Sequence, residues 1–386
     1  MRIGIDIRCL AEGKRTGVEE YTIALLSGLF EQFPENDYIL FFNAWKKQLP
    51  DFSWATRYPN VTLRVFHFPN KLLNFSLWYF RFPKLDTLIG GTDVFFLPNL
   101  NFSAVSRKTK LVVTAHDLSF ELFPDTFSLK RRIWHFFINF RSLVRNADAV
   151  IAVSESTKND LIDYYGVSEK KITVIHSGIG EQFSVMSRND TNLVRVQEKY
   201  HLPYKFILSL STFEPRKNLL ALISAFDALM ALDHPVLKKY MLVIAGTRGW
   251  KYRETFQAIK NSPYRKNILL TGFIADEDKS ALYNLSSLFV YPSFYEGFGF
   301  PPLEAMACGV SVIASHSSSL PEIVGSAGIL VDPYRPDELF QAMKQVLLDP
   351  ELLDTLRKQS ELRARDFQWS TSIASTAHIF SSIVEN

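Results

Sequence analysis

The sequence predicts an α/β protein of two domains, each a doubly wound parallel sheet with helices on both faces. Its length of 386 residues is too great for one ordinary hydrophobic core and suits two. Short strand-like apolar runs alternate with helical periodicity in two separate series. Between the series, residues 182–204 hold Ser, Asn, Asp and Arg and show no strand signal. We therefore place the domain junction there and predict domains at 1–185 and 186–369.

The first series fills the N-terminal domain. Its helical segments include residues 18–30, where apolar side chains recur at helical spacing. An acid, Asp6, stands inside the first apolar run, which indicates a strand and not a signal peptide. The expected strands are Ile3–Ile7, Tyr38–Phe42, Val61–Phe66, Val94–Leu97, Leu111–Ala115, Ala149–Val153 and Ile172–Ile175.

The second series fills the C-terminal domain. The expected strands are Phe206–Leu210, Met241–Ala245, Ile268–Leu270, Leu288–Tyr291, Val310–Ala314 and Gly328–Val331. A last helix, about residues 370–386, follows a break at residues 366–369. Two doubly wound domains in series predict a cleft between the ends of their strands.

The composition is typical of a globular protein and excludes a nucleic-acid binder. Hydrophobic residues make up 47% of the chain and charged residues 22%, as in a globular protein, and no run of eighteen apolar residues occurs. The net charge of +3 is too small for a nucleic-acid binder. The only cysteines, Cys9 and Cys308, favour a reducing compartment. We expect a cytoplasmic protein, peripheral at most at the inner face of the membrane.

The most informative motif runs from Glu296 to Glu304, with Gly297, Gly299 and two prolines between the two carboxylates. A strand precedes this turn and a helix starting at the paired prolines follows it, so the turn lies at the carboxyl end of a strand. Open α/β sheets bind ligands at that edge, where helix N–H groups attract anions. Amides for phosphate and carboxylates for hydroxyl groups suit a nucleotide-sugar.

A second motif, Glu214–Asn218, follows the first strand of the C-terminal domain. It places Arg216 and Lys217 immediately before a helix. Cations oppose the dipole of a helix N-terminus, so a bound anion would explain them. A planar guanidinium beside an ammonium suits a diphosphate.

The chain resembles the retaining glycosyltransferase family 4, whose GT-B fold has two Rossmann-like domains and whose signature is two glutamates separated by seven residues at this turn. Further family motifs occur in the same order over nearly the whole chain. They are Gly17-Val18 with Tyr21, His116-Asp117, Val153-Ser154-Glu155, Glu214-Pro215-Arg216-Lys217-Asn218, Ala245-Gly246 and Ser319-Leu320-Pro321-Glu322.

The resemblance implies roles for residues of the C-terminal domain. Glu296 would hold hydroxyl groups of the transferred sugar, and Glu304 would hold the ribose. Backbone amides of Phe298, Gly299 and Phe300 would face the sugar or phosphate. The loop at Phe273 would contact the nucleotide base through its backbone, while we expect the ring of Phe273 to pack in the core.

The resemblance also implies two residues of the N-terminal domain. After Arg15-Thr16, the amide of Gly17 opens a helix and would approach the diphosphate. His116 ends a strand and would orient the donor. We do not assign it as a general base, because adjacent residues such as Asp117 do not normally face each other. In relatives the last helix packs back on this domain.

Two other motifs are expected to have structural roles. Asp276-Glu277-Asp278 resembles a metal-binding Asp-x-Asp, but it starts a helix, where N-capping is the favoured interpretation. The glycines at 178–180 and 246–249 do not complete a dinucleotide-binding motif. We expect neither a metal nor a cofactor, so Arg216, Lys217 and helix amides would neutralise the diphosphate.

Two segments, Lys71–Lys84 and Ser128–Arg145, combine cations with aromatic residues. The favoured interpretation is a helix with its aromatic face in the core. The alternative is contact with an anionic membrane or a lipid-linked acceptor.

The sequence therefore predicts a metal-independent retaining glycosyltransferase that moves a hexose from a nucleoside-diphosphate sugar to a glycan or lipid-linked acceptor. Residues 16–18, 115–120 and 214–218 look most like bacterial mannosyltransferases of cell-surface polysaccharide assembly, so GDP-mannose is the first candidate donor. The alternatives are a catalytically silent partner of the same fold and a nucleotide-sugar epimerase.

Overall fold

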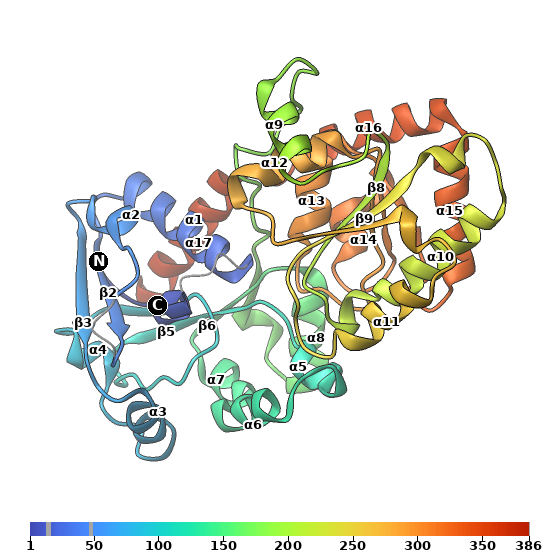
Figure 1. Ribbon diagram of the computed structural model, residues 1–386. Coiled ribbons are helices and arrows are strands. Elements are labelled where there is room, and N and C mark those ends of the chain that lie inside the picture. The colour runs from blue at the N-terminus through green and yellow to red at the C-terminus, as the bar shows by residue number, and fades with distance from the viewer. Residues whose placement is uncertain (13–16, 46–48, 386) are drawn as a thin grey trace. The chain divides into compact units, whose positions relative to one another are not determined.

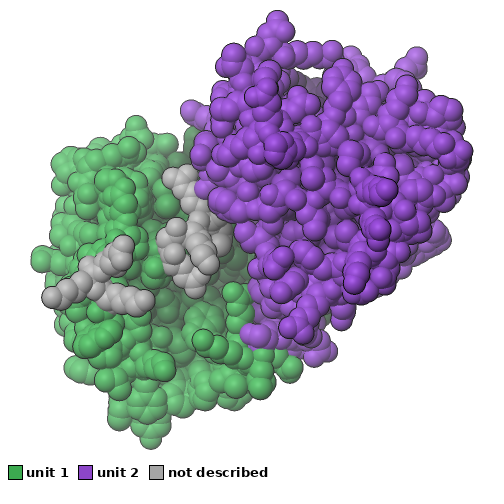
Figure 2. Space-filling model, in the orientation of Figure 1, with its two compact units in different colours: residues 1–118, 129–178, 368–386 green, residues 119–128, 179–367 purple. Residues whose placement is uncertain are grey.

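The computed structural model describes residues 1–12, 17–45 and 49–385. Arg15 and Thr16 of the predicted phosphate-facing loop lie outside the described residues. The chain divides into two compact units, coloured separately in Figure 2. Unit 1 comprises residues 1–118, 129–178 and 368–386, and unit 2 comprises residues 119–128 and 179–367.

Unit 1 contains a seven-stranded parallel sheet in the order β3-β2-β1-β4-β5-β6-β7. Its strands are β1 (Arg2–Asp6), β2 (Asp37–Asn43), β3 (Val61–Phe66), β4 (Val94–Leu97), β5 (Lys110–Ala115), β6 (Ala149–Ala152) and β7 (Ile172–Val174). Its helices are α1 (Gly17–Gln32), α2 (Ser53–Thr56), α3 (Asn70–Tyr79), α4 (Leu85–Leu88), α6 (Leu129–Ile138), α7 (Phe140–Asn146), α8 (Glu155–Tyr165) and α17 (Trp369–Glu385), and they appear on both sides of the sheet in Figure 1.

Unit 2 contains a six-stranded parallel sheet in the order β10-β9-β8-β11-β12-β13. Its strands are β8 (Phe206–Leu210), β9 (Met241–Ala245), β10 (Ile268–Gly272), β11 (Leu288–Tyr291), β12 (Val312–Ser315) and β13 (Ile329–Val331). Its helices are α5 (Ser119–Leu122), α9 (Thr191–Lys199), α10 (Leu219–Ala231), α11 (Arg253–Asn261), α12 (Asp276–Leu285), α13 (Phe300–Ala307), α14 (Leu320–Val324), α15 (Pro336–Leu348) and α16 (Pro350–Ala364). The predicted fold class is confirmed: both units are doubly wound α/β sheets.

The central strands of unit 2 are buried because helices cover both faces of the sheet. Every residue of β8, β11 and β12 is buried, as near-continuous apolar runs predict for parallel strands. Right-handed crossovers that step in opposite directions along the sheet put their helices on opposite faces. In unit 2, α10 and α15 accordingly share one hydrophobic core that includes Leu222, Phe226 and Met343, while α12 and α13 contact each other.

The C-terminal helix α17 belongs to unit 1 and packs against α1. A Cβ atom on Gly28 of α1 would lie 2.0 Å from Ile373 Cδ1, so only glycine permits this approach. Phe380 meets Phe96 of β4 with ring centroids 5.3 Å apart. The last helix therefore returns to the first sheet, which the sequence alone could not show.

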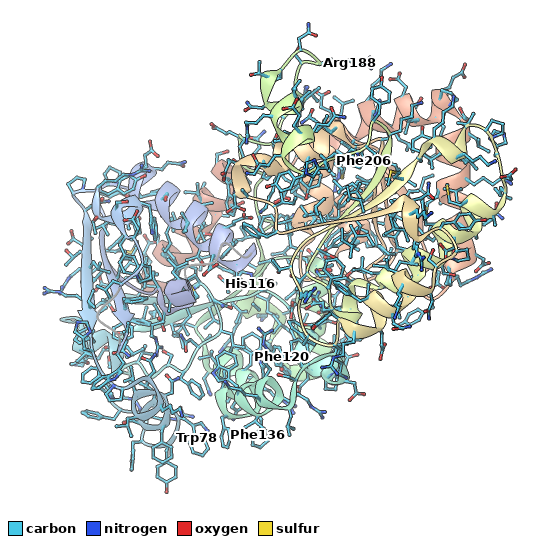
Figure 3. All side chains as sticks on the ribbon, in the orientation of Figure 1. Trp78, His116, Phe120, Phe136, Arg188 and Phe206 are labelled. Atoms are coloured by element: carbon cyan, nitrogen blue, oxygen red, sulfur yellow. The ribbon has the colours of Figure 1, made fainter. Side chains whose placement is uncertain are left out.

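The two aromatic-basic segments do not bury their aromatic faces, so the favoured interpretation is wrong. The segments meet in unit 1, where the rings of Trp78 and Phe137 are 5.0 Å apart, and Figure 3 shows Trp78 and Phe136 near each other at the lower edge of the view. We call this exposed set the aromatic surface: Leu72, Phe75, Trp78, Tyr79, Phe80, Phe82, Leu129, Ile133, Trp134, Phe136 and Phe137. The helices of these segments bury only Leu73 and Leu77 of α3, Ile138 of α6, and Phe140 and Val144 of α7.

None of the helices in the described part of the chain combines the length and the apolar character that crossing a membrane requires.

Candidate active site

The candidate site of unit 2 lies where the strand order reverses. From β8 the chain steps outward to β9 and β10, then returns to place β11 on the other side of β8. Helices leave adjacent strands in opposite directions at such a point, and ligands bind outside the carboxyl ends of those strands. The two loops at this point are the one after β8, residues 211–218, and the one after β11, residues 292–299.

The loop after β8 is shaped by Asn218. This residue adopts a left-handed φ of 53° and ends the short 3₁₀ turn Pro215–Lys217. Its side-chain amide donates to the carbonyl oxygens of Pro292 (3.1 Å) and Pro333 (2.7 Å). Asn tolerates the left-handed conformation better than most residues. Asn218 therefore ties the cationic turn to the loop after β11.

The central feature of the site is a cluster of ion pairs around Glu296. Its Oε2 lies 3.0 Å from Arg216 Nη1, and its Oε1 lies 2.7 Å from Lys217 Nζ. Arg216 Nη2 also meets Glu214 Oε1 at 2.9 Å, and Lys217 Nζ donates to the hydroxyl group of Tyr291 at 2.8 Å. The side chains of the two cations and two glutamates are at most 13% exposed. Arg216 and Lys217, which were predicted to bind the diphosphate, thus form one network with Glu296, which was predicted to bind the sugar.

The electrostatics of the cluster favour the charged form of Glu296. Burial raises the pKa of Glu296, but Arg216, Lys217 and the hydroxyl group of Ser293 outweigh burial and hold that pKa at about 2. Burial and the neighbouring charge of Arg216 lower the pKa of Lys217, and Glu296 opposes them. Glu296 is therefore an anion at any physiological pH, able to accept hydrogen bonds but not to act as a general acid.

The turn after Glu296 is held by serines and one strained glycine. The hydroxyl group of Ser319 donates to the carbonyl oxygens of Glu296 (3.0 Å) and Phe298 (2.6 Å). Gly299 precedes α13 with a φ of 115°, a conformation that L side chains rarely adopt. The helix begins at Phe300 and not at the prolines, because Pro301 and Pro302 fit its first positions, which need no N–H partner.

The other predicted residues of unit 2 have different surroundings. Glu304 lies within α13 and is only 3% exposed, and its Oε2 accepts a hydrogen bond from Tyr283 at 2.6 Å. The ring of Phe298 is buried and meets that of Phe300 at 5.1 Å. The ring of Phe273 is 66% exposed, so the expectation that it packs in the core is wrong. Phe273 follows β10, which lies at the edge of the sheet, where few groups can cover a side chain.

Two of the predicted site residues, Gly17 and His116, belong to unit 1, whereas the cluster around Glu296 belongs to unit 2. Gly17 is the exposed first residue of α1. His116 follows β5, and its Nε2 donates to the carbonyl oxygen of Pro98 at 2.8 Å. Burial lowers the pKa of His116, while Pro98 and Asp117 oppose the change. The imidazole is therefore neutral at pH 7, and its edge packs against the ring of Tyr21 at 4.8 Å.

The acidic triplet has a structural role other than the one expected. Asp276, Glu277 and Asp278 occupy the first turn of α12, but Ala275 is the cap residue and no side chain caps the helix. Asp278 instead pairs with Arg195 (2.7 Å) and Lys199 (2.6 Å) of α9. The N-capping interpretation is wrong in this respect, because a completely buried carboxylate needs cationic partners more than the helix needs a cap.

Within residues 1–12, 17–45 and 49–385, no group of three or more His, Cys, Asp or Glu side chains is arranged to hold a metal ion. Metal independence stays a prediction.

The comparisons with known proteins decide the family. Residues 15–183 match the model described as Glycosyltransferase Family 4, and residues 191–363 match the one described as Glycosyl transferases group 1. O-antigen chain mannosyltransferase B of Escherichia coli is 30% identical over 281 residues, which cover 72% of this chain and 72% of that protein. The chain belongs to glycosyltransferase family 4.

Two further comparisons place this family 4 member among its relatives. Serotype-specific mannosyltransferase WbdA of Escherichia coli is 34% identical over 272 residues, or 70% of this chain, but the match spans only 32% of WbdA. The crystal structure of Anabaena Alr3699/HepE in complex with UDP-glucose has a TM-score of 0.73 and 19% identity, covering 99% of this chain and 100% of that one. This likeness shows the fold, which is GT-B.

Sequence reasoning missed four residues of this family 4 site. Glu214 pairs with Arg216, and Ser293 donates to Glu296. Tyr291 accepts a hydrogen bond from Lys217, and Asn218 joins the two loops. Glu214 and Asn218 were within the predicted motif, yet nothing in the sequence gave them partners. Tyr291 ends β11, and Ser293 lies in the loop between β11 and Glu296. The adjacency of β8 and β11 was the missing information.

Proposed function

We propose that the protein is a glycosyltransferase that moves a hexose from a nucleoside-diphosphate sugar to a hydroxyl group of a glycan or lipid-linked acceptor. The first candidate donor is GDP-mannose, because both Escherichia coli relatives are named mannosyltransferases. The acceptor would belong to cell-surface polysaccharide assembly, as the name O-antigen chain mannosyltransferase B suggests. As the resemblance implies, transfer would retain the anomeric configuration and need no metal.

The observation that carries the proposal is the meeting of Arg216, Lys217 and Glu296 at the switch point of unit 2. Two buried cations beside one another attract a doubly charged diphosphate, and the carboxylate can accept hydrogen bonds from sugar hydroxyl groups. The same carboxylate pairs with both cations, so a bound diphosphate would compete with it for them.

The chemistry of the proposed transfer is a substitution at the anomeric carbon. The bond from that carbon to the diphosphate oxygen breaks, and a bond to the acceptor oxygen forms. We favour attack from the same face, with the departing phosphate taking the acceptor proton. Arg216 and Lys217 would stabilise the negative charge that develops on the leaving oxygen. The neutral His116 would orient the donor through a hydrogen bond, and the exposed ring of Phe273 would offer a surface to the base.

The direct test replaces Arg216 or Lys217 by Ala and measures donor affinity by calorimetry. We expect a loss of roughly 1.5 to 3 kcal/mol, the contribution of a hydrogen bond to a charged group. The matched control is Lys358→Ala, which removes an ammonium that is 75% exposed on α16 and pairs with Asp354. Donor binding and turnover that match the unsubstituted protein in both Arg216 and Lys217 variants would exclude the phosphate role.

The donor and the reaction class are tested together. A thermal-shift panel of GDP-, UDP-, ADP- and dTDP-sugars identifies the nucleotide, and GDP-mannose is expected to give the largest shift. Incubation with that donor alone, analysed by mass spectrometry and NMR, then separates the alternatives. Conversion of the sugar without an acceptor would indicate an epimerase. Tight donor binding without any turnover when glycan or lipid-linked acceptors are also supplied would indicate a silent partner.

We also propose that the aromatic surface of unit 1 contacts an anionic membrane. Phe136 is 80% exposed and Phe80 is 64% exposed, an arrangement that costs free energy in water. Lys71 and Arg81 are exposed beside these rings. Aromatic side chains flanked by cations suit the head-group region of an anionic leaflet.

Vesicle co-sedimentation tests the membrane contact. The protein should bind phosphatidylglycerol vesicles more than phosphatidylcholine vesicles, and added salt should weaken the binding. Phe80→Ser with Phe136→Ser should reduce it, whereas the control Leu362→Ser, at a 61% exposed leucine of unit 2, should not. Equal sedimentation of all variants would remove the aromatic surface from the proposal.

A further inference from the structure

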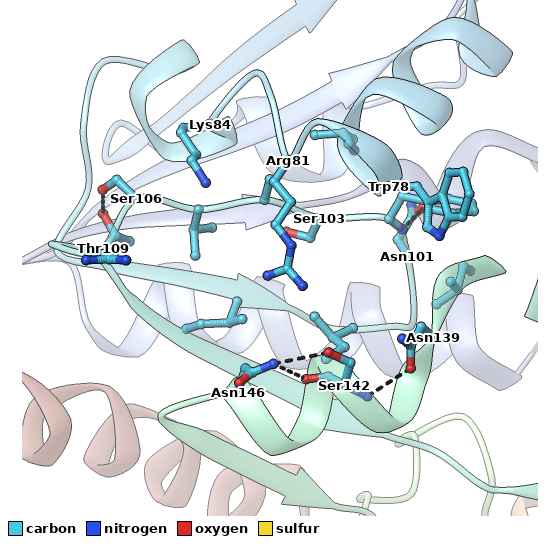
Figure 4. A pocket seen from close by; sticks show the side chains of 18 of the residues that line it. Trp78, Arg81, Lys84, Asn101, Ser103, Ser106, Thr109, Asn139, Ser142 and Asn146 are labelled. Atoms are coloured by element: carbon cyan, nitrogen blue, oxygen red, sulfur yellow. Dashed lines mark hydrogen bonds between the residues drawn. The ribbon is translucent and has the colours of Figure 1, made fainter. Parts of the chain in front are cut away.

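Unit 1 contains a cavity of about 400 Å³ that no step of the proposed transfer uses. It lies between the segment joining α3 to α4, the loop after β4 at residues 101–109, and helix α7 (Figure 4). Its lining includes Thr109 and Leu111 at the amino end of β5, whereas His116 follows the carboxyl end of that strand. The cavity is therefore a feature separate from the predicted donor residues.

The charges that line the cavity are mainly positive. Arg81, Lys84 and Arg107 contribute cations, and Asp148 contributes the one carboxylate among the lining residues. Asp148 already accepts a hydrogen bond from the backbone N–H of Leu111 at 2.8 Å. The side chains of Arg81 and Lys84 form no hydrogen bond or ion pair with any residue that the structure describes. Figure 4 shows the guanidinium of Arg81 extending into the cavity.

Neutral polar groups complete the lining. Ser103 Oγ is buried and has no hydrogen-bond partner within the described parts of the chain. Across the cavity, Asn139 accepts from the backbone N–H of Ser142 through its Oδ1, which turns the side-chain oxygen toward the helix. Its amide N–H groups remain as donors. A buried hydroxyl group without a partner costs free energy unless a ligand or water binds it. Donors and cations in one enclosed place suit a phosphate oxygen.

One wall of the cavity joins the aromatic surface. Trp78 and Leu77 line the cavity, and Trp78 is also 40% exposed on the aromatic surface. Ile138, at the end of α6, lines the cavity beside them. A ligand with a phosphate in the cavity can therefore lay a hydrocarbon chain over the exposed rings without leaving apolar contact.

We propose that this cavity binds the phosphate group of an amphiphilic phosphate ester, whose hydrocarbon chain lies on the aromatic surface. Arg81 and Lys84 supply the charge, Ser103 and Asn139 supply hydrogen bonds, and Trp78 contacts the first carbons of the chain. This binding needs no sugar donor and no turnover, so its failure and the failure of the proposed transfer can be distinguished.

Calorimetry with three ligands tests the proposal on the full chain. The ligands are dodecyl phosphate below its micellar concentration, inorganic phosphate, and phosphatidylglycerol vesicles. Dodecyl phosphate should bind at least about tenfold more tightly than inorganic phosphate, because only the ester carries a chain. Arg81→Gln with Lys84→Gln should weaken dodecyl phosphate binding about tenfold or more.

A matched variant separates the cavity from general attraction to cations. Lys108→Gln changes an exposed cation of the loop after β4, next to Arg107, that does not line the cavity, and it should leave dodecyl phosphate binding unchanged. Circular dichroism should show all variants folded, since Arg81 is exposed and Lys84 half-buried.

Four results would overturn the inference. The first is equal binding of dodecyl phosphate by the double variant and the unsubstituted protein. The second is an equal loss in Lys108→Gln. The third is binding of vesicles without binding of dodecyl phosphate, which would indicate surface attraction alone. Inorganic phosphate binding as tightly as the ester would also contradict it.

Discussion

The ion-paired cluster makes a sharp prediction for Glu296→Gln. The substitution keeps the shape of the side chain but removes its charge, so Arg216 and Lys217 lose their common carboxylate while remaining nearly buried. Ser293 also loses a charged acceptor. A buried charge without compensation is costly, and removing one partner of a buried pair typically destabilises a protein by ~3–5 kcal/mol.

The depressed pKa gives an independent magnitude. The pKa of Glu296 falls from 4.5 to about 2, and each pKa unit corresponds to about 1.4 kcal/mol, so the carboxylate contributes about 3 kcal/mol at neutral pH. Because the folded pKa lies below the unfolded value, this contribution is complete above pH 4.5 and is lost as the pH falls toward 2.

Denaturant unfolding at several pH values provides the assay. At pH 7 the variant should be less stable by about 3 kcal/mol, a decrease in melting temperature of roughly 6–12 °C for a unit of this size. The difference between the two proteins should shrink below pH 4.5. As a control, Glu361→Gln removes an exposed partner of Arg365 on α16 and should change stability by at most about 0.5 kcal/mol. A stability difference at pH 7 no larger than that of the control would refute the reasoning.

A ligand measurement distinguishes the structural contribution of Glu296 from its proposed role. In the Gln variant, Arg216 and Lys217 no longer share a carboxylate, so a nucleoside diphosphate without its sugar should bind as tightly as before or more tightly. Turnover should fall, because the proposed acceptor for the sugar hydroxyl groups is weaker. Weaker binding of the nucleoside diphosphate would contradict a cluster that competes with phosphate for the same cations.

Three further predictions follow from other contacts. Asp278→Asn should destabilise the protein by about 2 kcal/mol in denaturant unfolding, because a completely buried carboxylate loses its charge between two cations of α9. Tyr283→Phe should cost about 1–3 kcal/mol in the same assay, since it removes the hydrogen bond to the buried Glu304. Burial lowers the pKa of His116 and lowers that of His135 to about 4, so both take up protons more readily when unfolded. The free energy of unfolding should therefore decrease as the pH falls below 6.5, and less so in His135→Gln.

Each of these three predictions has a contradicting result. If the Asp278 variant is as stable as the unsubstituted protein, the ion pairs between Asp278 and the half-exposed cations of α9 contribute nothing to the free energy of unfolding. Unchanged stability in Tyr283→Phe would mean that other groups fully satisfy Glu304. An identical pH dependence with and without His135 would exclude that imidazole as a titrating group between pH 4 and 6.5.

Much of the fold could be predicted because its signals are local. Each predicted strand overlaps an observed one, since parallel strands covered on both faces require continuous apolar runs that are visible in sequence. The start of α13 was misplaced by one residue, because prolines fit inside the first turn as well as at its start. The exposure of the aromatic surface could not be predicted, since helical periodicity shows that a helix has an apolar face but not what covers that face.

The candidate site shows the same division. The sequence by itself determined which residues carry charge beside glycine and proline turns, and it placed Arg216, Lys217 and Glu296 just after strands. Only the tertiary structure decided that these three form one cluster, because pairing β8 with β11 joins loops about 80 residues apart. Local sequence governs backbone conformation within a few residues, whereas sheet order, burial and therefore the pKa of Glu296 depend on contacts between distant segments.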